Sequence, residues 1–253
     1  NNLGQISLVK HWSRCLDMVK DEKWIIILGD DDLLGTNCIQ DFYNNLIEIE
    51  RKNISVVRFA SLVINEKDEI ISNKYNHPII ETSVDFFERK HQGGTRSSLS
   101  EYVFKESDFS LKEFPLAWHT DDLAVLECSN YGVVYSINTA YVSFRHSSEN
   151  ITGRVCDLKI KNESSFQFYY YLNKFRRFKF SASQQFLLSK KLNISIINNK
   201  SNVSRIFEVN YLYLYQFRIG RIVALQIEIL KSLLKKIIYE IFSYCTRFKS
   251  FWY

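Results

Sequence analysis

The chain has 253 residues, of which 46% are apolar and 24% are charged, and its formal net charge is +5. This length and composition are typical of a folded globular protein and exclude a disordered or low-complexity chain. The five cysteines are widely spaced and form no CxxC pair, which excludes a disulfide-rich scaffold and a cysteine-based zinc site. The sequence also has no apolar run of the roughly 20 residues that a membrane-spanning helix needs.

The charge is unevenly distributed along the chain. Residues 1–150 contain 15 basic and 23 acidic residues, a net charge of −8. Residues 151–253 contain 18 basic and 5 acidic residues, a net charge of +13. An acidic half favours metal or cation chemistry, and a basic half favours an anionic partner such as a membrane surface, a nucleic acid or a phosphorylated substrate.

The first predicted elements lead to an acidic turn. Apolar residues at helical spacing predict an amphipathic helix over residues 6–20. Residues 24–28 form a continuous apolar run that ends at a glycine, which predicts a strand buried on both faces, as in a parallel sheet. Asp30, Asp31 and Asp32, here called the acid triplet, follow directly. We therefore expect them at the carboxyl end of this strand, where ligands bind in open α/β sheets.

The elements that follow alternate between helix and strand. A second helix is predicted from an N-cap at Thr36 to Lys52, with one apolar face. The residues of that face are Ile39, Phe42, Tyr43, Leu46 and Ile47. Further patterns predict strands at 55–64, 102–104, 133–137 and 141–145, and helices at 82–90 and from an N-cap at Thr120 to about Asn130. This alternation predicts an α/β protein with a parallel or mixed sheet and flanking helices.

The acid triplet is a candidate metal site. Three adjacent carboxylates repel one another unless a cation lies between them. Because Mg²⁺ and Mn²⁺ prefer hard oxygen ligands, the triplet suits such an ion bridging a diphosphate. The ion would act as a Lewis acid and stabilise charge on a departing phosphate. The alternative interpretation is a solvated acidic turn before a helix.

Two further places carry candidate catalytic or ligand residues. Asp121 and Asp122 follow Thr120 at a predicted helix start, and a carboxylate there could take a proton from an attacking hydroxyl. Acids at a helix N-terminus are also favourable without any function. His146 follows a predicted strand and is either a third metal ligand or a surface histidine.

The pair Gly93–Gly94 lies in the most flexible-looking stretch of the chain, residues 91–98. It could let the backbone approach a sugar or a phosphate closely, or it could be a plain flexible loop. The chain contains neither of the glycine-rich phosphate-binding patterns GxGxxG and GxxxxGK.

The C-terminal part of the chain is rich in aromatic and basic residues. Aromatic and basic side chains alternate over residues 166–180, and residues 205–243 are apolar with interspersed lysines. Three interpretations remain open: a helical subdomain that packs its own core, a region that lies on a membrane surface, and a surface that stacks on nucleic-acid bases.

Taken together, these segments resemble the bacterial family-two glycosyltransferases, which have the GT-A fold. Four segments carry the resemblance in chain order: Asn1-x-Leu3-Gly4 (the N-x-G loop), Ile-Leu-Gly-Asp30-Asp31-Asp32 (the DxD metal motif), Gly93 to Phe104 (the loop and strand before the acceptor site) and Trp118-His119-Thr120-Asp121-Asp122-Leu123 (the acidic ED motif). It covers about residues 1–155, which it implies to be a partial GT-A catalytic domain. Residues 156–253 are then the basic, aromatic-rich helical C-terminal region.

The resemblance implies roles for the candidate residues. Asp122 would be the catalytic base, with Asp121 beside it. The metal ion would be held by Asp30, Asp32 and His146, and the donor would be bound by Asp30, Asp31, Gly93 and Gly94.

The sequence departs from the family in three respects. Gly29 stands where many members have the first Asp, and Asp121 replaces the usual Glu. The family also opens with two further strands and their helices, which form the pocket for the nucleotide base. The resemblance therefore implies that this sequence is a fragment, with an exposed sheet edge and poor nucleotide-sugar binding of its own.

The predicted function is that of an inverting glycosyltransferase of the hexosyltransferase type. It would move a sugar from a nucleotide-diphosphate sugar to a hydroxyl of a cell-surface polysaccharide or a lipid-linked glycan. Mg²⁺ or Mn²⁺ is the implied cofactor. The expected location is the cytoplasm, peripheral on the inner face of the membrane, without a nucleic-acid partner. Two alternatives are a metal-dependent phosphoryl-transfer enzyme or nuclease and a non-catalytic membrane-surface module.

Overall fold

The computed structural model describes residues 7–147, 151, 156–199 and 201–249, so the Asn1-x-Leu3-Gly4 segment lies outside the described residues. Backbone contacts divide the chain into two compact units. The first unit comprises residues 1–164 and 178–184, and the second comprises residues 165–177 and 185–253.

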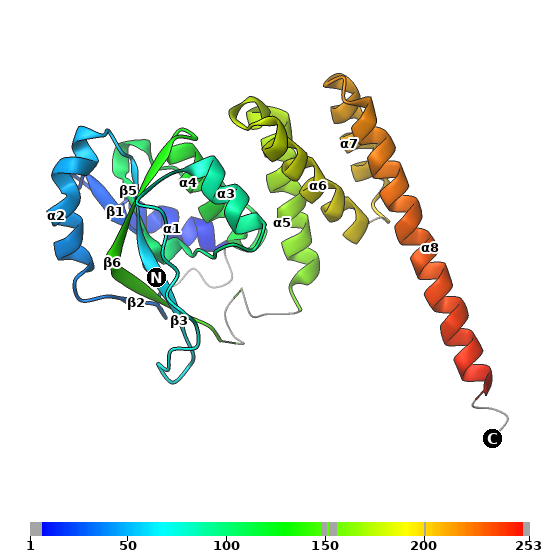
Figure 1. The fold of residues 1–253 in the computed structure, drawn as a ribbon, viewed down its shortest axis with the longest axis horizontal. Coiled ribbons are helices and arrows are strands. Elements are labelled where there is room, and N and C mark those ends of the chain that lie inside the picture. The colour runs from blue at the N-terminus through cyan, green and yellow to red at the C-terminus, as the bar shows by residue number, and fades with distance from the viewer. Residues whose placement is uncertain (1–6, 148–150, 152–155, 200, 250–253) are drawn as a thin grey trace. The chain divides into compact units, whose positions relative to one another are not determined.

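The first unit is a sheet with helices around it (Figure 1). Its strands are β1 (Trp24–Ile26), β2 (Leu33–Leu34), β3 (Val56–Ile64), β4 (Ile80–Thr82), β5 (Tyr102–Lys105) and β6 (Val133–Arg145). Its helices are α1 (Leu8–Leu16), α2 (Cys38–Arg51), α3 (Ser83–His91) and α4 (Thr120–Cys128), with short 3₁₀ turns η1 (Leu99–Glu101), η2 (Glu106–Asp108) and η3 (Pro115–Ala117).

The sheet is mixed. Its strand order is β1-β5-β3-β6-β2, and β4 also pairs with β6. β3 and β6 are parallel, whereas β5 runs antiparallel to both of its neighbours. The predicted α/β class with a mixed sheet and flanking helices is therefore confirmed.

The two strands expected at 133–137 and 141–145 are one strand, β6. Its pairing with β3 jumps from Phe59 opposite Ile137 to Ala60 opposite Tyr141. Three extra residues are thus accommodated in β6 without ending it, as in a β-bulge. Asn138 and Thr139 are polar residues in this bulge, and they are the reason why the sequence predicted two strands instead of one.

β1 differs from its prediction as a central parallel strand. Within the described residues it pairs only with β5, in antiparallel orientation, and so lies at the edge of the sheet. Its side chains still enter both faces. Ile25 belongs to the core cluster on one face, whereas Trp24 and Ile26 pack against the cluster on the other. The apolar run therefore predicted correctly that residues 24–26 contact both faces of the sheet. It did not predict the strand direction, and Leu28, expected in the same buried strand, is 42% exposed.

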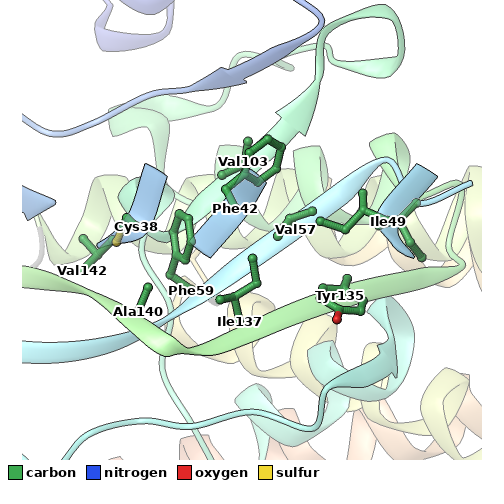
Figure 2. Close-up of a cluster of buried hydrophobic side chains, with 11 residues drawn as sticks. Cys38, Phe42, Ile49, Val57, Phe59, Val103, Tyr135, Ile137, Ala140 and Val142 are labelled. Carbon is green, nitrogen blue, oxygen red and sulfur yellow. The ribbon is translucent and has the colours of Figure 1, made fainter. Parts of the chain in front are cut away.

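Two apolar clusters sandwich the sheet. On one face, Phe42 and Ile49 of α2 pack on Val57 and Phe59 of β3 and on Ile137 of β6 (Figure 2). The other face has a separate cluster that joins α3 and α4 to the sheet. Its members include Phe86, Tyr102, Phe104, Ala124 and Val125. Alternate residues of each strand serve opposite faces, as the pleat requires.

The apolar face predicted for α2 was largely wrong. Ile47, which was expected in the core, is 83% exposed, and Ile39 and Tyr43 are exposed too. Ile49, which was not expected there, is fully buried. The helix begins at Cys38, whose thiol donates to the carbonyl of Tyr141. Cys38, Phe42 and Ile49 are therefore the residues of this helix that are fully packed against the sheet.

The second unit is helical. Its elements are the C-terminal part of α5 (Leu158–Tyr171), the π-helical turn η4 (Leu172–Arg176), α6 (Ala182–Asn198), α7 (Val203–Tyr215) and α8 (Ile219–Lys249); the 3₁₀ turn η5 (Arg177–Lys179) lies at the boundary. Apolar side chains such as Phe168, Leu188 and Leu225 form its interior. In the described part of the chain, no helix combines the length and apolarity needed to cross a membrane.

The corrected face of α2 can be tested with a matched pair of substitutions. Ile49→Ala removes a fully buried side chain and is expected to lower the free energy of unfolding by about 2–5 kcal/mol. Ile47→Ala changes an exposed side chain on the same helix and is expected to stay within about 0.5 kcal/mol of wild type. Urea unfolding followed by circular dichroism measures both, and equal losses would contradict the observed rotation of the helix.

Candidate functional site

Asp32 is the buried member of the acid triplet. One carboxylate oxygen, Oδ1, accepts a hydrogen bond of 2.9 Å from the backbone N–H of Arg145, and the other accepts one from the hydroxyl of Ser100. These bonds connect the loop after β1 to η1 and to the end of β6. Burial raises the pKa of Asp32, and the bond from Ser100 opposes this rise.

Gly29 leaves room for this arrangement. Its N–H donates to the hydroxyl oxygen of Ser100 at 2.9 Å, and a Cβ at this position would come within 3.0 Å of Oδ2 of Asp32. A side chain here would therefore crowd the carboxylate. This accounts locally for glycine at a position where the resemblance suggests an acid.

The other two residues of the acid triplet are more exposed than Asp32. Asp30 is exposed and Asp31 is half-buried. The backbone carbonyl of Asp31 accepts a bond from Nε of Arg145, and the exposed His146 is the next residue along the chain. The acid triplet therefore lies beside the end of β6, but among the described residues the ligand atoms of Asp30, Asp32 and His146 do not form a group within 4.8 Å of one another.

Asp122 lies in a compact polar centre at the start of α4. Nζ of Lys90 donates to its Oδ1 at 2.6 Å, and Nδ1 of His119 lies 2.8 Å from its Oδ2. Its side chain is only 6% exposed. Burial alone would raise the pKa of Asp122, but the Lys90 charge and the His119 hydrogen bond outweigh burial and hold the pKa well below its usual range.

Asp121 behaves in the opposite way. Burial and the negative charge of Asp122 raise the pKa of Asp121, although Lys90 and His119 counteract this. Of the two adjacent acids, Asp122 is therefore the one that the structure keeps ionised. Its position in the first turn of a helix adds to that preference.

The segment before α4 has an unusual backbone. Leu116, Ala117 and His119 all have positive φ, with values of 58°, 54° and 72°. Such conformations are costly for residues other than glycine and persist where the surroundings enforce them. The N-cap is His119 and not the predicted Thr120, whose hydroxyl instead donates to the carbonyl of Lys112.

A second histidine, His91, lies next to this centre. Its Nδ1 is 2.9 Å from the carbonyl oxygen of Phe87, and its ring stacks beside that of His119 with centroids 6.2 Å apart. Burial lowers the pKa of His91 to about 4. Potential metal-ligating atoms of His91, His119 and Asp122 all lie within 4.8 Å of one another. The ammonium of Lys90 already supplies a positive charge at this carboxylate, so a metal ion would have to compete with it.

A buried charge network lies between the sheet and α3. Arg58 of β3 is fully buried and donates to Ser136 and, at 3.0 Å, to Glu81. Glu81 also accepts two bonds from Arg89, at 2.9 and 2.7 Å. Arg89 in turn lies 3.1 Å from Nδ1 of His77. The two arginines share the carboxylate of Glu81, so these three side chains together carry a net positive charge.

Glu101 extends this network toward Lys90. It is fully buried, and its Oε1 lies 4.0 Å from Nε2 of His77. Burial raises the pKa of Glu101 to about 7, against the opposing charges of Arg96, Arg58 and Lys90. Burial and the neighbouring arginines lower the pKa of His77 to about 2, so this histidine is neutral.

The acid triplet and the Asp122 centre each have a neighbour in or near η1. Ser100 of η1 contacts Asp32 directly. Glu101, the next residue, is affected by the charge of Lys90, which bonds Asp122. Both acidic places belong to the first unit.

Gly93 and Gly94 end α3. Gly93 has a φ of +82°, its N–H donates to the carbonyl of Lys90, and the N–H of Gly94 donates to that of Arg89. This is the Schellman arrangement that commonly terminates helices. The pair thus has a structural role, which fixes the helix end that carries Lys90 and His91.

Sequence reasoning missed two basic residues of the site. Lys90 was the last residue of the predicted helix 82–90, and His91 was assigned to the flexible-looking stretch 91–98. The available signal was their position just before the helix-ending pair Gly93–Gly94, with only Gln92 between. Arg58 gave a clearer signal, because an arginine within an apolar strand must find a buried partner.

No model of a known protein family matches the chain, and no curated protein matches it significantly.

The raised pKa of Glu101 makes stability depend on pH. A carboxyl whose folded pKa is raised contributes stability fully below pH 4.5, and this contribution is lost as the pH rises through about 7. Glu101→Gln removes the ionisation and is expected to stabilise the protein by up to about 3 kcal/mol at pH 8, with little difference at pH 4.5.

Urea unfolding at several pH values measures this effect. The exposed Glu66→Gln is the matched control and is expected to follow wild type throughout. A Glu101→Gln protein that is no more stable than wild type at pH 8 would show that Glu101 is ionised at little cost.

Proposed function

We propose that this chain is part of an inverting glycosyltransferase that moves a sugar from a nucleotide-diphosphate sugar to a hydroxyl of a cell-surface or lipid-linked glycan. The base function lies at Asp122, and the acid triplet binds the diphosphate through Mg²⁺ or Mn²⁺. The GT-A fold belongs to this proposal, which the mixed sheet and its flanking helices support.

The state of Asp122 carries the proposal. It is a buried carboxylate that remains ionised, and it lies in the first turn of α4. The ammonium of Lys90 and the ring nitrogen Nδ1 of His119 lie beside its two oxygens. Such a centre can accept a proton from a hydroxyl and stabilise the resulting charge. The contact of Asp32 with Ser100 of η1, and the charge of Lys90 acting on Glu101 of the same turn, support a shared site in which one end binds the donor and the other activates the acceptor.

The acid triplet has the donor chemistry that a hard divalent cation requires. Asp30 presents an exposed carboxylate, and each oxygen of Asp32 accepts one hydrogen bond and retains a second lone pair. With His146 at the adjacent end of β6, these residues would hold the ion. When bound, it would supply Lewis-acid stabilisation of the leaving diphosphate.

We also propose that α7 and α8 dock on the inner face of the membrane. Both helices expose large apolar side chains, among them Phe207, Tyr211, Leu230, Leu234 and Ile237. On α8 these residues recur every three or four positions, and exposed Lys231, Lys235 and Lys236 lie among them. An apolar stripe bordered by lysines fits an anionic lipid surface.

The base function predicts a large effect of one substitution. Asp122→Asn is expected to reduce transfer by about 10²–10⁴-fold while donor binding is retained. Transfer is measured by release of UDP or GDP from a panel of nucleotide sugars in the presence of glycan acceptors, and donor binding by calorimetry.

Two controls accompany this experiment. Thermal unfolding verifies that the variant folds, because Asp122→Asn leaves Lys90 without its ion-pair partner. The exposed Glu66→Gln is expected to keep wild-type activity. Undiminished turnover in a folded Asp122→Asn protein would refute the base function, and cleavage of DNA or RNA would favour a nuclease instead.

Membrane docking predicts a dependence on lipid charge. The chain is expected to float with phosphatidylglycerol-containing vesicles and not with pure phosphatidylcholine vesicles. Replacing Lys231, Lys235 and Lys236 with glutamine is expected to weaken binding at least tenfold, at about 1 kcal/mol per lysine. The control removes equal charge from Lys10, Lys20 and Lys67 of the first unit and should leave binding unchanged. A dimer in solution without vesicle binding would identify a second copy as the occupant of this face.

A further inference from the structure

We infer that Phe217, in the turn between α7 and α8, is a membrane anchor whose ring enters the headgroup region of an anionic lipid surface. This inference rests on the membrane docking in the proposed function. It adds the residue that penetrates the lipid and the point at which the second unit is held there. All of its residues belong to that unit.

Phe217 occupies a backbone position that does not suit it. α7 has its C-cap at Gln216, and Phe217 follows with a φ of 55°. The N–H of the next residue, Arg218, donates to the carbonyl of Tyr213 at 2.8 Å, which is the long hydrogen bond of a Schellman motif. Glycine, and less often asparagine, fills this left-handed position in most helices, because a Cβ there is unfavourable.

Two other helices of the chain follow this preference. Asn53 comes directly after the C-cap of α2 with a φ of 51°, and the N–H of Ile54 donates to the carbonyl of Ile49 in the same pattern. Gly93 takes the corresponding position after α3. Phe217 therefore departs from a rule that the sequence keeps at these two helix ends.

Packing inside the protein does not compensate for this choice of residue. Tyr131 is another aromatic residue with a positive φ, of 63°, but its side chain is buried in the core. Phe217 is 93% exposed. A single exposed apolar side chain is ordinary, whereas one at a left-handed position is not, because glycine would be both less strained and less apolar there. We therefore look for the gain outside the chain.

The turn holds the ring of Phe217 in a fixed place. Nε2 of Gln216 donates to the backbone carbonyl of Asn173 at 2.8 Å, and Nη2 of Arg218 donates to the hydroxyl oxygen of Ser189 at 2.8 Å. Asn173 and Ser189 are both fully buried. Both neighbours of Phe217 are thus bonded to the interior of the second unit, and the exposed ring between them loses little conformational freedom when it binds.

An anionic lipid surface fits the surroundings of this ring. Its exposed neighbours along the chain are Tyr211, Leu214, Tyr215 and Ile219, and aromatic and apolar side chains of this kind are favoured at the depth of lipid headgroups. α8 begins at Ile219, so the positive end of its helix dipole lies at this turn. Residues 151–253 also carry a net charge of +13, which complements anionic lipids.

Replacement by glycine separates the fold from the binding. Phe217→Gly removes the unfavourable Cβ and is expected to raise the midpoint of thermal unfolding by about 1–4 °C. It also removes the ring and is expected to weaken binding to phosphatidylglycerol-containing vesicles about tenfold. Co-sedimentation of the full chain with vesicles measures binding. Weaker binding by a more stable protein cannot come from misfolding.

Two further variants control the experiment. Asn53→Gly introduces glycine at the equivalent position of α2, where the exposed Asn53 lies in the first unit, and should leave vesicle binding unchanged. Phe217→Trp is expected to keep wild-type binding, and the fluorescence that it adds should be quenched by lipids with brominated acyl chains. Added fluorescence that brominated lipids do not quench would overturn the inference.

The outcomes distinguish this inference from the docking proposal. If the wild-type chain binds no vesicles, membrane docking and the anchor both fail. If the wild-type chain binds and Phe217→Gly binds equally well, docking stands and only the anchor fails. A dimer in solution that dissociates in Phe217→Gly would identify a second copy of the chain as the partner of this ring, and would also overturn the inference.

Discussion

The ion pair between Lys90 and Asp122 is the interaction on which the candidate site depends. Lys90 lies in the last turn of α3 and Asp122 in the first turn of α4. Helix C-termini favour cations and helix N-termini favour anions, so each helix end stabilises the charge that it carries. The pair therefore joins two helix ends that the second core cluster also holds together. Removing either partner would leave an uncompensated charge in a site that is largely closed to water.

The buried charges between the sheet and α3 are stabilised by pairing with one another. Arg58 and Arg89 share the carboxylate of Glu81, and His77 remains neutral. Buried ion pairs seldom add net stability, because desolvation offsets their attraction. Their effect here is positional. They hold β3, β4 and α3 at fixed spacing, and α3 in turn places Lys90 and His91 beside Asp122.

The sequence predicted the parts of the fold that depend on local pattern. Hydrophobic runs located β3 and β5, and the predicted helix over residues 82–90 lies within one residue of α3 at both ends. Strand direction, the edge position of β1 and the rotation of α2 depend on contacts between distant residues, and no local pattern contains them. Ile47 and Ile49 illustrate this, because both are isoleucines on one helix and only packing decides which is buried.

The sequence likewise located some residues of the candidate site but did not predict their surroundings. Motif resemblance pointed to Asp32 and Asp122, and the structure shows Asp32 in contact with Ser100 of η1 and Asp122 paired with Lys90 of α3. Their environments could not be predicted, because the partners come from elsewhere in the chain: Ser100 and Arg145 for Asp32, and Lys90 for Asp122. The left-handed backbone conformation of His119 could not be predicted either, because such conformations are uncommon in residues other than glycine and the sequence does not locate them.

Asp32 and Asp122 show that burial alone does not set the behaviour of a carboxyl group. Both are similarly buried, yet the pKa of Asp32 is raised and that of Asp122 is lowered. The difference lies in the partners. The Ser100 hydroxyl and the Arg145 N–H stabilise the charge on Asp32 less than the water that burial removes. The positive charge of Lys90 stabilises the charge on Asp122 more than that water would. An added cation would lower the pKa of Asp32 and gain more there than at Asp122, where Lys90 already supplies the charge. This difference supports the proposed cation at Asp32 and the proposed proton transfer at the Asp122 centre, the two roles that the proposed sugar transfer assigns to these acids.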